Sequence, residues 1–78
     1  MSRGWVFTVN NWVEEDEACL NALAERCSYF VMGKETGEQG TPHLQGYARF
    51  AAGLRKREVL GMLSERLGHQ IHLRVARA

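Results

Sequence analysis

The sequence contains no run of about 18 consecutive apolar residues, the length that a membrane-spanning helix needs. Its N-terminus also lacks the apolar core that follows the basic residue of a secretory signal peptide. We therefore predict an intracellular protein that has no membrane partner. With 78 residues, the chain is too short for more than one domain, which we expect to span residues 1–78.

Cysteine is scarce as well, because only Cys19 and Cys27 are present. They lie eight residues apart, in one predicted helix and its end, which is too far for a disulfide within a regular helix. This spacing is also not typical of a metal site. We predict two reduced cysteines that pack as small hydrophobic side chains.

Net charge is nearly absent, at +1, but it is unevenly distributed. Residues 1–48 carry a net charge of −4, whereas residues 49–78 carry +5. The acids of residues 14–17 fall in the first turns of a predicted helix, where the helix dipole favours negative charge, so they need no catalytic role. The basic second half indicates a polyanionic partner, and the alternative is a solvated surface.

Hydrophobic periodicity predicts six elements in the order β-α-β-β-α-β. The first half has a strand over residues 5–10, a helix from about Val13 with an apolar face running to Cys27, and strands over 28–35 and 43–50 joined by a turn at 37–42. After a break at 51–53, a second helix carries Val59, Leu60, Leu63 and Leu67 and ends at Gly68. The last element is a strand over 70–75. This order predicts an α+β, ferredoxin-like fold, a four-stranded antiparallel sheet with two helices on one face. The other face of the sheet is expected to be open.

Alternation along the third predicted strand identifies the residues of that open face. If Leu44, Ala48 and Phe50 face the helices, the opposite face carries His43, Gln45, Tyr47 and Arg49. Glu35 on the neighbouring strand can project from the same side. An imidazole, an amide oxygen and a carboxylate placed in this way can bind one divalent cation, Mg²⁺ or Mn²⁺. The alternative is a set of solvated polar residues beside a hairpin turn.

A basic cluster, Arg55-Lys56-Arg57, lies near the start of the second predicted helix, where the dipole disfavours positive charge by up to about 1 kcal/mol. This placement indicates a phosphate-bearing partner. Alternatively, the long basic side chains only cover the helix surface. His69 and His72 are left out of the predicted metal site, because lone histidines at a strand edge are usually structural or solvated.

The element order and two segments resemble an RNA-recognition-motif domain. The run Gln45-Gly46-Tyr47-Ala48-Arg49-Phe50 is similar to the longer motif of that family, and Val6-Phe7-Thr8-Val9-Asn10 is similar to the shorter one. This resemblance implies a module that binds single-stranded RNA without a metal, and we keep it as the alternative function.

A second resemblance covers essentially the whole chain. Trp5-Val6-Phe7-Thr8-Val9-Asn10-Asn11, then Met32-Gly33-Lys34-Glu35 followed by Gly40-Thr41-Pro42-His43-Leu44-Gln45-Gly46-Tyr47, and finally Ile71 to Arg77 resemble successive motifs of one family. This family is the N-terminal HUH-type endonuclease domain of rolling-circle replication initiator (Rep) proteins of circular single-stranded DNA viruses, especially the circovirus-like group.

The resemblance implies a metal-dependent nickase and nucleotidyltransferase that acts on single-stranded DNA at a replication origin. A divalent metal polarises the scissile phosphate, and a tyrosine attacks it to form a 5′-phosphotyrosyl link. The implied metal ligands are Glu35, His43 and Gln45, the same three as the alternation argument selects. The implied DNA contacts are the first-motif residues Phe7, Thr8, Asn10 and Asn11, to which we add Tyr47, Arg49, Arg55, Lys56 and Arg57.

The sequence departs from this family at the nucleophile. The family's third motif is a tyrosine followed three residues later by lysine, whereas Tyr29 and Tyr47 are followed at that spacing by Met32 and Phe50. The resemblance implies that the nucleophilic tyrosine belongs beyond Ala78, on a helix after the last strand. We therefore assign no catalytic residue and expect a truncated domain that binds metal and origin DNA without cutting.

Three expectations concern assembly and location. Exposed sheet edges favour pairing between chains, and we expect the parent protein to be oligomeric. For a virus of eukaryotes, we expect location in the host nucleus. A purely structural or assembly module is the remaining alternative function.

Overall fold

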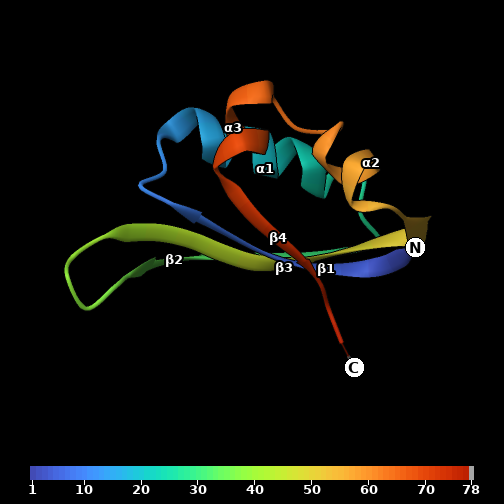
Figure 1. Ribbon diagram of the computed structural model, residues 1–78, viewed down its shortest axis with the longest axis horizontal. Coiled ribbons are helices and arrows are strands. Elements are labelled where there is room, and N and C mark those ends of the chain that lie inside the picture. The colour runs from blue at the N-terminus through green and yellow to red at the C-terminus, as the bar shows by residue number, and fades with distance from the viewer. Residues whose placement is uncertain (78) are drawn as a thin grey trace.

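The computed structural model describes residues 1–77, and the strands of this part of the chain form one antiparallel sheet (Figure 1). The elements are β1 (Ser2–Asn10), α1 (Glu14–Ala24), β2 (Tyr29–Thr36), β3 (Pro42–Leu54), α2 (Lys56–Leu60), α3 (Glu65–Gln70) and β4 (Ile71–Val75). The strand order is β2-β3-β1-β4, and the three helices lie on one side of the sheet. This arrangement confirms the predicted α+β fold with one open sheet face.

The core lies between the sheet and the helices. β1 and β3 pair so that Trp5 lies opposite Ala48 and Val9 lies opposite Leu44, and all four side chains are buried. The other buried apolar residues are Phe7, Leu20, Leu23, Phe50, Val59, Leu63, Leu67 and Leu73. The predicted alternation of β3 is therefore confirmed, and the residues between the buried ones face away from the helices.

Asp16 joins α1 to α3. Its carboxylate is 2% exposed, accepts a hydrogen bond from the Val13 backbone N–H at 3.0 Å, and pairs with Arg66 Nη1 at 2.6 Å. The first contact satisfies one of the N–H groups that a helix start leaves free. Asp16 therefore does more than match the helix dipole, because it also holds the two helices together.

The prediction of one continuous second helix is wrong. The segment forms two short helices, α2 and α3, separated by residues 61–64. Gly61, a weak helix former, ends the first, and the Ser64 hydroxyl accepts a hydrogen bond from the Leu67 N–H at 3.2 Å to begin the second. Gly68 consequently lies inside α3 and is not the predicted helix end.

The predicted break at residues 51–53 is also wrong, because β3 continues to Leu54. The N-terminal residues of β1 supply the pairing partner: Ser2 lies opposite Leu54, with a register shift between Ser2 and Gly4. The outer strands of the sheet are β2 and β4. Pairing between chains would have to use one of these edges, and it stays a prediction.

Both cysteines are free, as predicted, and half-buried against the core. The Cys27 thiol donates a hydrogen bond to the Leu23 carbonyl oxygen at 3.3 Å. Burial raises the pKa of the Cys27 thiol, so the neutral form is favoured at neutral pH. In the described part of the chain, no helix is long and apolar enough to cross a membrane.

Candidate functional site

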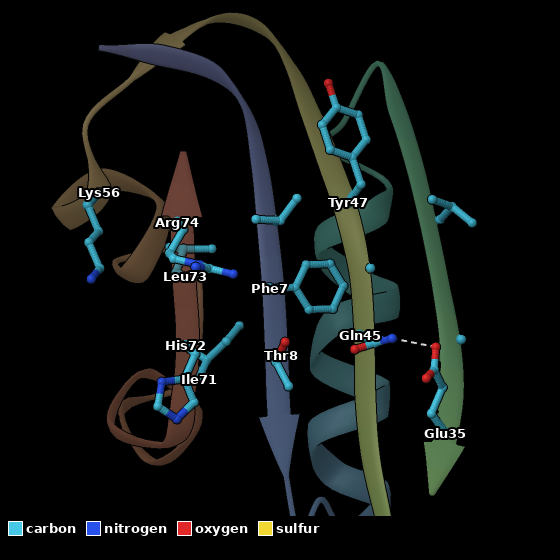
Figure 2. Close-up of a pocket in the computed structure, with 14 residues that line it drawn as sticks. Phe7, Thr8, Glu35, Gln45, Tyr47, Lys56, Ile71, His72, Leu73 and Arg74 are labelled. Carbon is cyan, nitrogen blue, oxygen red and sulfur yellow. Dashed lines mark hydrogen bonds between the residues drawn. The ribbon is translucent and has the colours of Figure 1, made fainter. Parts of the chain in front are cut away.

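The open face of the sheet carries its side chains in rows that cross the strands, because directly paired residues of antiparallel strands point to the same side. In the order β2, β3, β1, β4, the rows are Glu35, His43 and Asn10; then Gly33, Gln45, Thr8 and His72; then Val31, Tyr47, Val6 and Arg74; then Tyr29, Arg49 and Gly4. A hollow of about 930 Å³ lies over the two middle rows and reaches Glu35 (Figure 2).

The three predicted metal ligands lie together on this face. Glu35 pairs with His43 in the register of β2 and β3, and the His43 Nε2 and Glu35 Oε1 atoms are 4.0 Å apart. The Gln45 amide donates a hydrogen bond from Nε2 to Glu35 Oε2. The predicted convergence of an imidazole, an amide and a carboxylate is thus present in the geometry.

The side chains of this cluster carry nitrogen and oxygen atoms of the kinds that divalent cations take as ligands. Within residues 1–77, no three His, Cys, Asp or Glu side chains form a cluster that could hold a metal, so Gln45 would have to supply the third protein ligand. Its amide now presents the NH₂ group to Glu35, and a half-turn about the terminal torsion would present the carbonyl oxygen in its place. One nitrogen and two oxygen ligands suit Mg²⁺ or Mn²⁺.

The hairpin turn between β2 and β3 determines the register that brings Glu35 opposite His43. The Gly37 N–H donates to the Thr41 carbonyl oxygen and the Gly40 N–H donates to the Gly37 carbonyl oxygen, both at 2.9 Å. Gly40 has a φ of 80°, which a residue with a Cβ adopts only with strain. The turn chemistry of the sequence therefore places the carboxylate and the imidazole side by side.

The residues of the first motif divide between the two faces. Thr8 and Asn10 lie on the open face, opposite Gln45 and His43 respectively. Phe7 points to the helices, is 3% exposed and stacks on Phe30 with ring centroids 5.6 Å apart. Phe7 therefore contributes only to the floor of the hollow and does not lie among the exposed candidates.

Asn11 lies in the turn that follows β1. Its φ is 53°, a left-handed conformation that asparagine tolerates better than most residues. The Asn11 N–H donates to the Pro42 carbonyl oxygen at 2.8 Å. The residue type at this position therefore has a structural explanation, which does not depend on a DNA contact.

The aromatic and basic candidates on β3 lie further along the same face. Tyr47 packs beside Tyr29 with ring centroids 6.1 Å apart, and Tyr29 is 57% exposed. Arg49 is exposed and lies opposite Tyr29 in the register of β2 and β3. These side chains form an exposed surface on which unpaired bases could stack.

The predicted position of the nucleophile falls at the C-terminal end of the chain. The resemblance puts the tyrosine motif beyond Ala78, and Ala78 itself lies outside the described residues. The expectation of a nucleophile after Ala78 therefore stays a prediction. The described residues include two tyrosines, Tyr29 and Tyr47, and both belong to the open face of the sheet.

The structure separates the members of the basic cluster. Lys56 lines the hollow, whereas Arg55, which precedes α2, and Arg57 on α2 are exposed and do not line it. His72 and Arg74 also line the hollow, and neither was predicted as a site residue. The alternation of β4 places both side chains on one face, but only the strand order shows that this face adjoins Thr8 and Val6.

Comparison with known proteins gives a consistent result over the whole chain. The family described as "Putative viral replication protein" matches residues 2–78. The chain is 50% identical over 50 residues to the replication-associated protein of Canary circovirus, covering 63% of this chain and 17% of that protein. It is 40% identical over 76 residues to the replication-associated protein of Goose circovirus, and the match covers 94% of this chain and 25% of that protein.

A relative from outside the circoviruses also matches. The Para-Rep C2 protein of Subterranean clover stunt C2 alphasatellite is 37% identical over 79 residues, which cover 99% of this chain and 27% of that protein. The chain thus spans about a quarter or less of the length of the relatives it matches.

Proposed function

Because the chain belongs to the viral replication protein family that its residues 2–78 match, we propose that it is the part of a replication initiator that binds single-stranded DNA at a replication origin together with a divalent metal ion. The convergence of Glu35, His43 and Gln45 on an uncovered sheet face, next to Thr8 and Asn10, carries this proposal. The name "replication-associated protein", shared by the circovirus relatives, supports the replication role.

The metal would be held by Glu35, His43 and the Gln45 carbonyl oxygen. When bound, it would polarise a phosphate oxygen and orient the DNA strand. Thr8 and Asn10 lie beside these ligands and can donate hydrogen bonds to the same strand. The open face, with the exposed Tyr29 ring beside the half-buried Tyr47 ring, suits unpaired bases, since any base can stack on an aromatic ring.

We propose that neither tyrosine of this chain acts as the nucleophile. In Figure 2 the Tyr47 hydroxyl points away from Glu35, the carboxylate of the candidate metal site. Tyr29 is paired with Arg49, further along the strands from Glu35. Neither residue has lysine three positions later. The expected activity of this chain is therefore binding without strand cleavage.

Metal binding is tested by titrating Mn²⁺ into the wild type and two histidine variants by calorimetry. We expect one site in the wild type and in His69→Ala, which alters an exposed histidine of α3. His43→Ala should weaken binding by more than the roughly 10–100-fold that losing an outer-shell partner costs, because it removes a ligand. Equal affinity of His43→Ala and the wild type, or no binding in either, would contradict the metal site.

DNA binding is tested by fluorescence anisotropy with a labelled single-stranded origin oligonucleotide and with RNA of the same sequence. We expect the DNA to bind in Mn²⁺, and Tyr47→Ala to cost about 1–3 kcal/mol because a base loses its stacking partner. We also expect no covalent protein–DNA product on a denaturing gel. Tighter, metal-independent RNA binding would favour the RNA-recognition module, binding of neither would favour a structural module, and a covalent product would identify a nucleophile in this chain.

A further inference from the structure

Basic side chains gather at the β4 side of the hollow, across the sheet from Glu35 (Figure 2). Arg74 lies opposite Val6 and His72 lies opposite Thr8, so both project from the open face. Lys56, the first residue of α2, reaches the same hollow from the connection after β3. We call Lys56, His72 and Arg74 the β4 subsite. Its members come from two segments that only the tertiary fold brings together.

The two cations of the β4 subsite have no carboxylate partner in the described part of the chain. The ion pairs there join Lys34 to Glu17, Arg66 to Asp16 and His43 to Glu35, and none of them includes Lys56 or Arg74. Among the described residues, Glu35 is the one carboxylate that lines the hollow, and it lies on β2. The positive charges at the β4 side are thus available for an anion from outside the chain.

The spacing of the sheet separates the β4 subsite from the candidate metal ligands. Neighbouring strands lie about 4.8 Å apart, so in the order β2-β3-β1-β4 the strand β4 is roughly 14 Å from β2, which carries Glu35, and roughly 10 Å from β3, which carries His43 and Gln45. Arg74 lies on β4 and the candidate metal ligands lie on β2 and β3, with β1 between them. An extended polynucleotide carries a phosphate at every nucleotide, so it can place one phosphate at the metal ligands and another at Arg74.

We infer that the β4 subsite binds a backbone phosphate of the single strand, separate from the phosphate that the candidate metal would contact. This inference rests on the proposed function, because it assigns a second contact to the same ligand. Arg74 presents a planar guanidinium that can bind phosphate through two hydrogen bonds, and Lys56 adds a point charge. His72 contributes an imidazole as a further hydrogen-bonding group.

The test measures the affinity of a labelled single-stranded oligothymidine as a function of KCl concentration. Each lost phosphate contact should reduce the slope of log K against log salt by about 0.7. We expect Arg74→Gln and Lys56→Gln each to show this reduction and to weaken binding about five- to tenfold at low salt. The matched control, Arg26→Gln after α1, removes the same charge from an exposed residue outside the hollow and should leave the slope unchanged.

The outcomes separate this inference from the proposed function. No binding of DNA by the wild type would overturn both. Wild-type binding with the same affinity and slope in Arg74→Gln, Lys56→Gln and the Arg26→Gln control would overturn the β4 subsite and leave the proposed function standing. Thermal melts by circular dichroism verify folding; Arg74 and Lys56 are exposed and on different elements, so either variant alone can carry the test.

Discussion

Replacing Gly46 by alanine is expected to prevent stable folding of this domain. A Cβ at Gly46 would lie 2.1 Å from the Val31 carbonyl oxygen and 2.8 Å from Phe7 Cζ. Gly46 belongs to the inner strand β3, paired with Phe7 on one side and Met32 on the other, so neither neighbour can move without disturbing the sheet. Overpacking typically costs about 1–3 kcal/mol and occasionally more, and here the obstacle is backbone. We expect a loss of at least about 3 kcal/mol, against a total of roughly 5 kcal/mol for a small domain.

Gly33→Ala is the matched control for this prediction. Gly33 lies on the adjacent strand β2, and a Cβ there would meet no atom within 4 Å. We expect its free energy of unfolding to stay within about 1 kcal/mol of the wild type. Urea denaturation followed by circular dichroism measures both variants. Equal denaturation midpoints for Gly46→Ala and Gly33→Ala would show that the strands accommodate the extra atom.

Replacing Asp16 by alanine should have the second largest effect, a loss of about 2–4 kcal/mol in the free energy of unfolding. The substitution leaves the Val13 N–H without its acceptor and removes the anchor of Arg66 on α3. Hydrogen bonds that involve a charged group contribute about 1.5–3 kcal/mol each. The ion-pair part of the effect is reduced by solvent, because the Arg66 side chain is 51% exposed.

Two further variants separate the contributions of Asp16. Glu15→Ala removes an exposed acid from the same helical turn and should change stability by no more than about 0.5 kcal/mol. Arg66→Ala should cost less than Asp16→Ala, and the double variant should cost less than the sum of the two, because the pair can be lost only once. Urea midpoints that are the same for Asp16→Ala and Glu15→Ala would remove the structural role of the buried carboxylate.

Much of the candidate site was predictable from sequence, because a strand has a side-chain period of two. Once His43–Phe50 is identified as a strand, burial of Leu44 and Ala48 places His43 and Gln45 on the opposite face. The glycine-rich turn then brings Glu35 beside them, since a hairpin pairs residues at equal distances from its turn. The same argument, applied to β1, would have placed Phe7 in the core, where the structure has it.

The helical layer was less predictable. Leu60, Leu63 and Leu67 have the spacing of one helix, and the sequence does not show whether the chain continues through Gly61 or restarts at Ser64. Tertiary packing decides this choice, because Val59, Leu63 and Leu67 are buried in the interrupted arrangement. Similarly, the extension of β3 to Leu54 depends on Ser2, which is distant in the sequence.

The sequence by itself determined the number and order of the strands, the inward and outward alternation of the central strands and the cluster of Glu35, His43 and Gln45. All of these depend on local periodicity or on one short turn. Only the tertiary structure decided that Lys56 reaches the hollow while Arg55 and Arg57 do not, and that Arg74 shares it. Such contacts join segments distant along the chain, and their positions depend on the strand order and on the packing of α2 against the sheet, which no local pattern specifies.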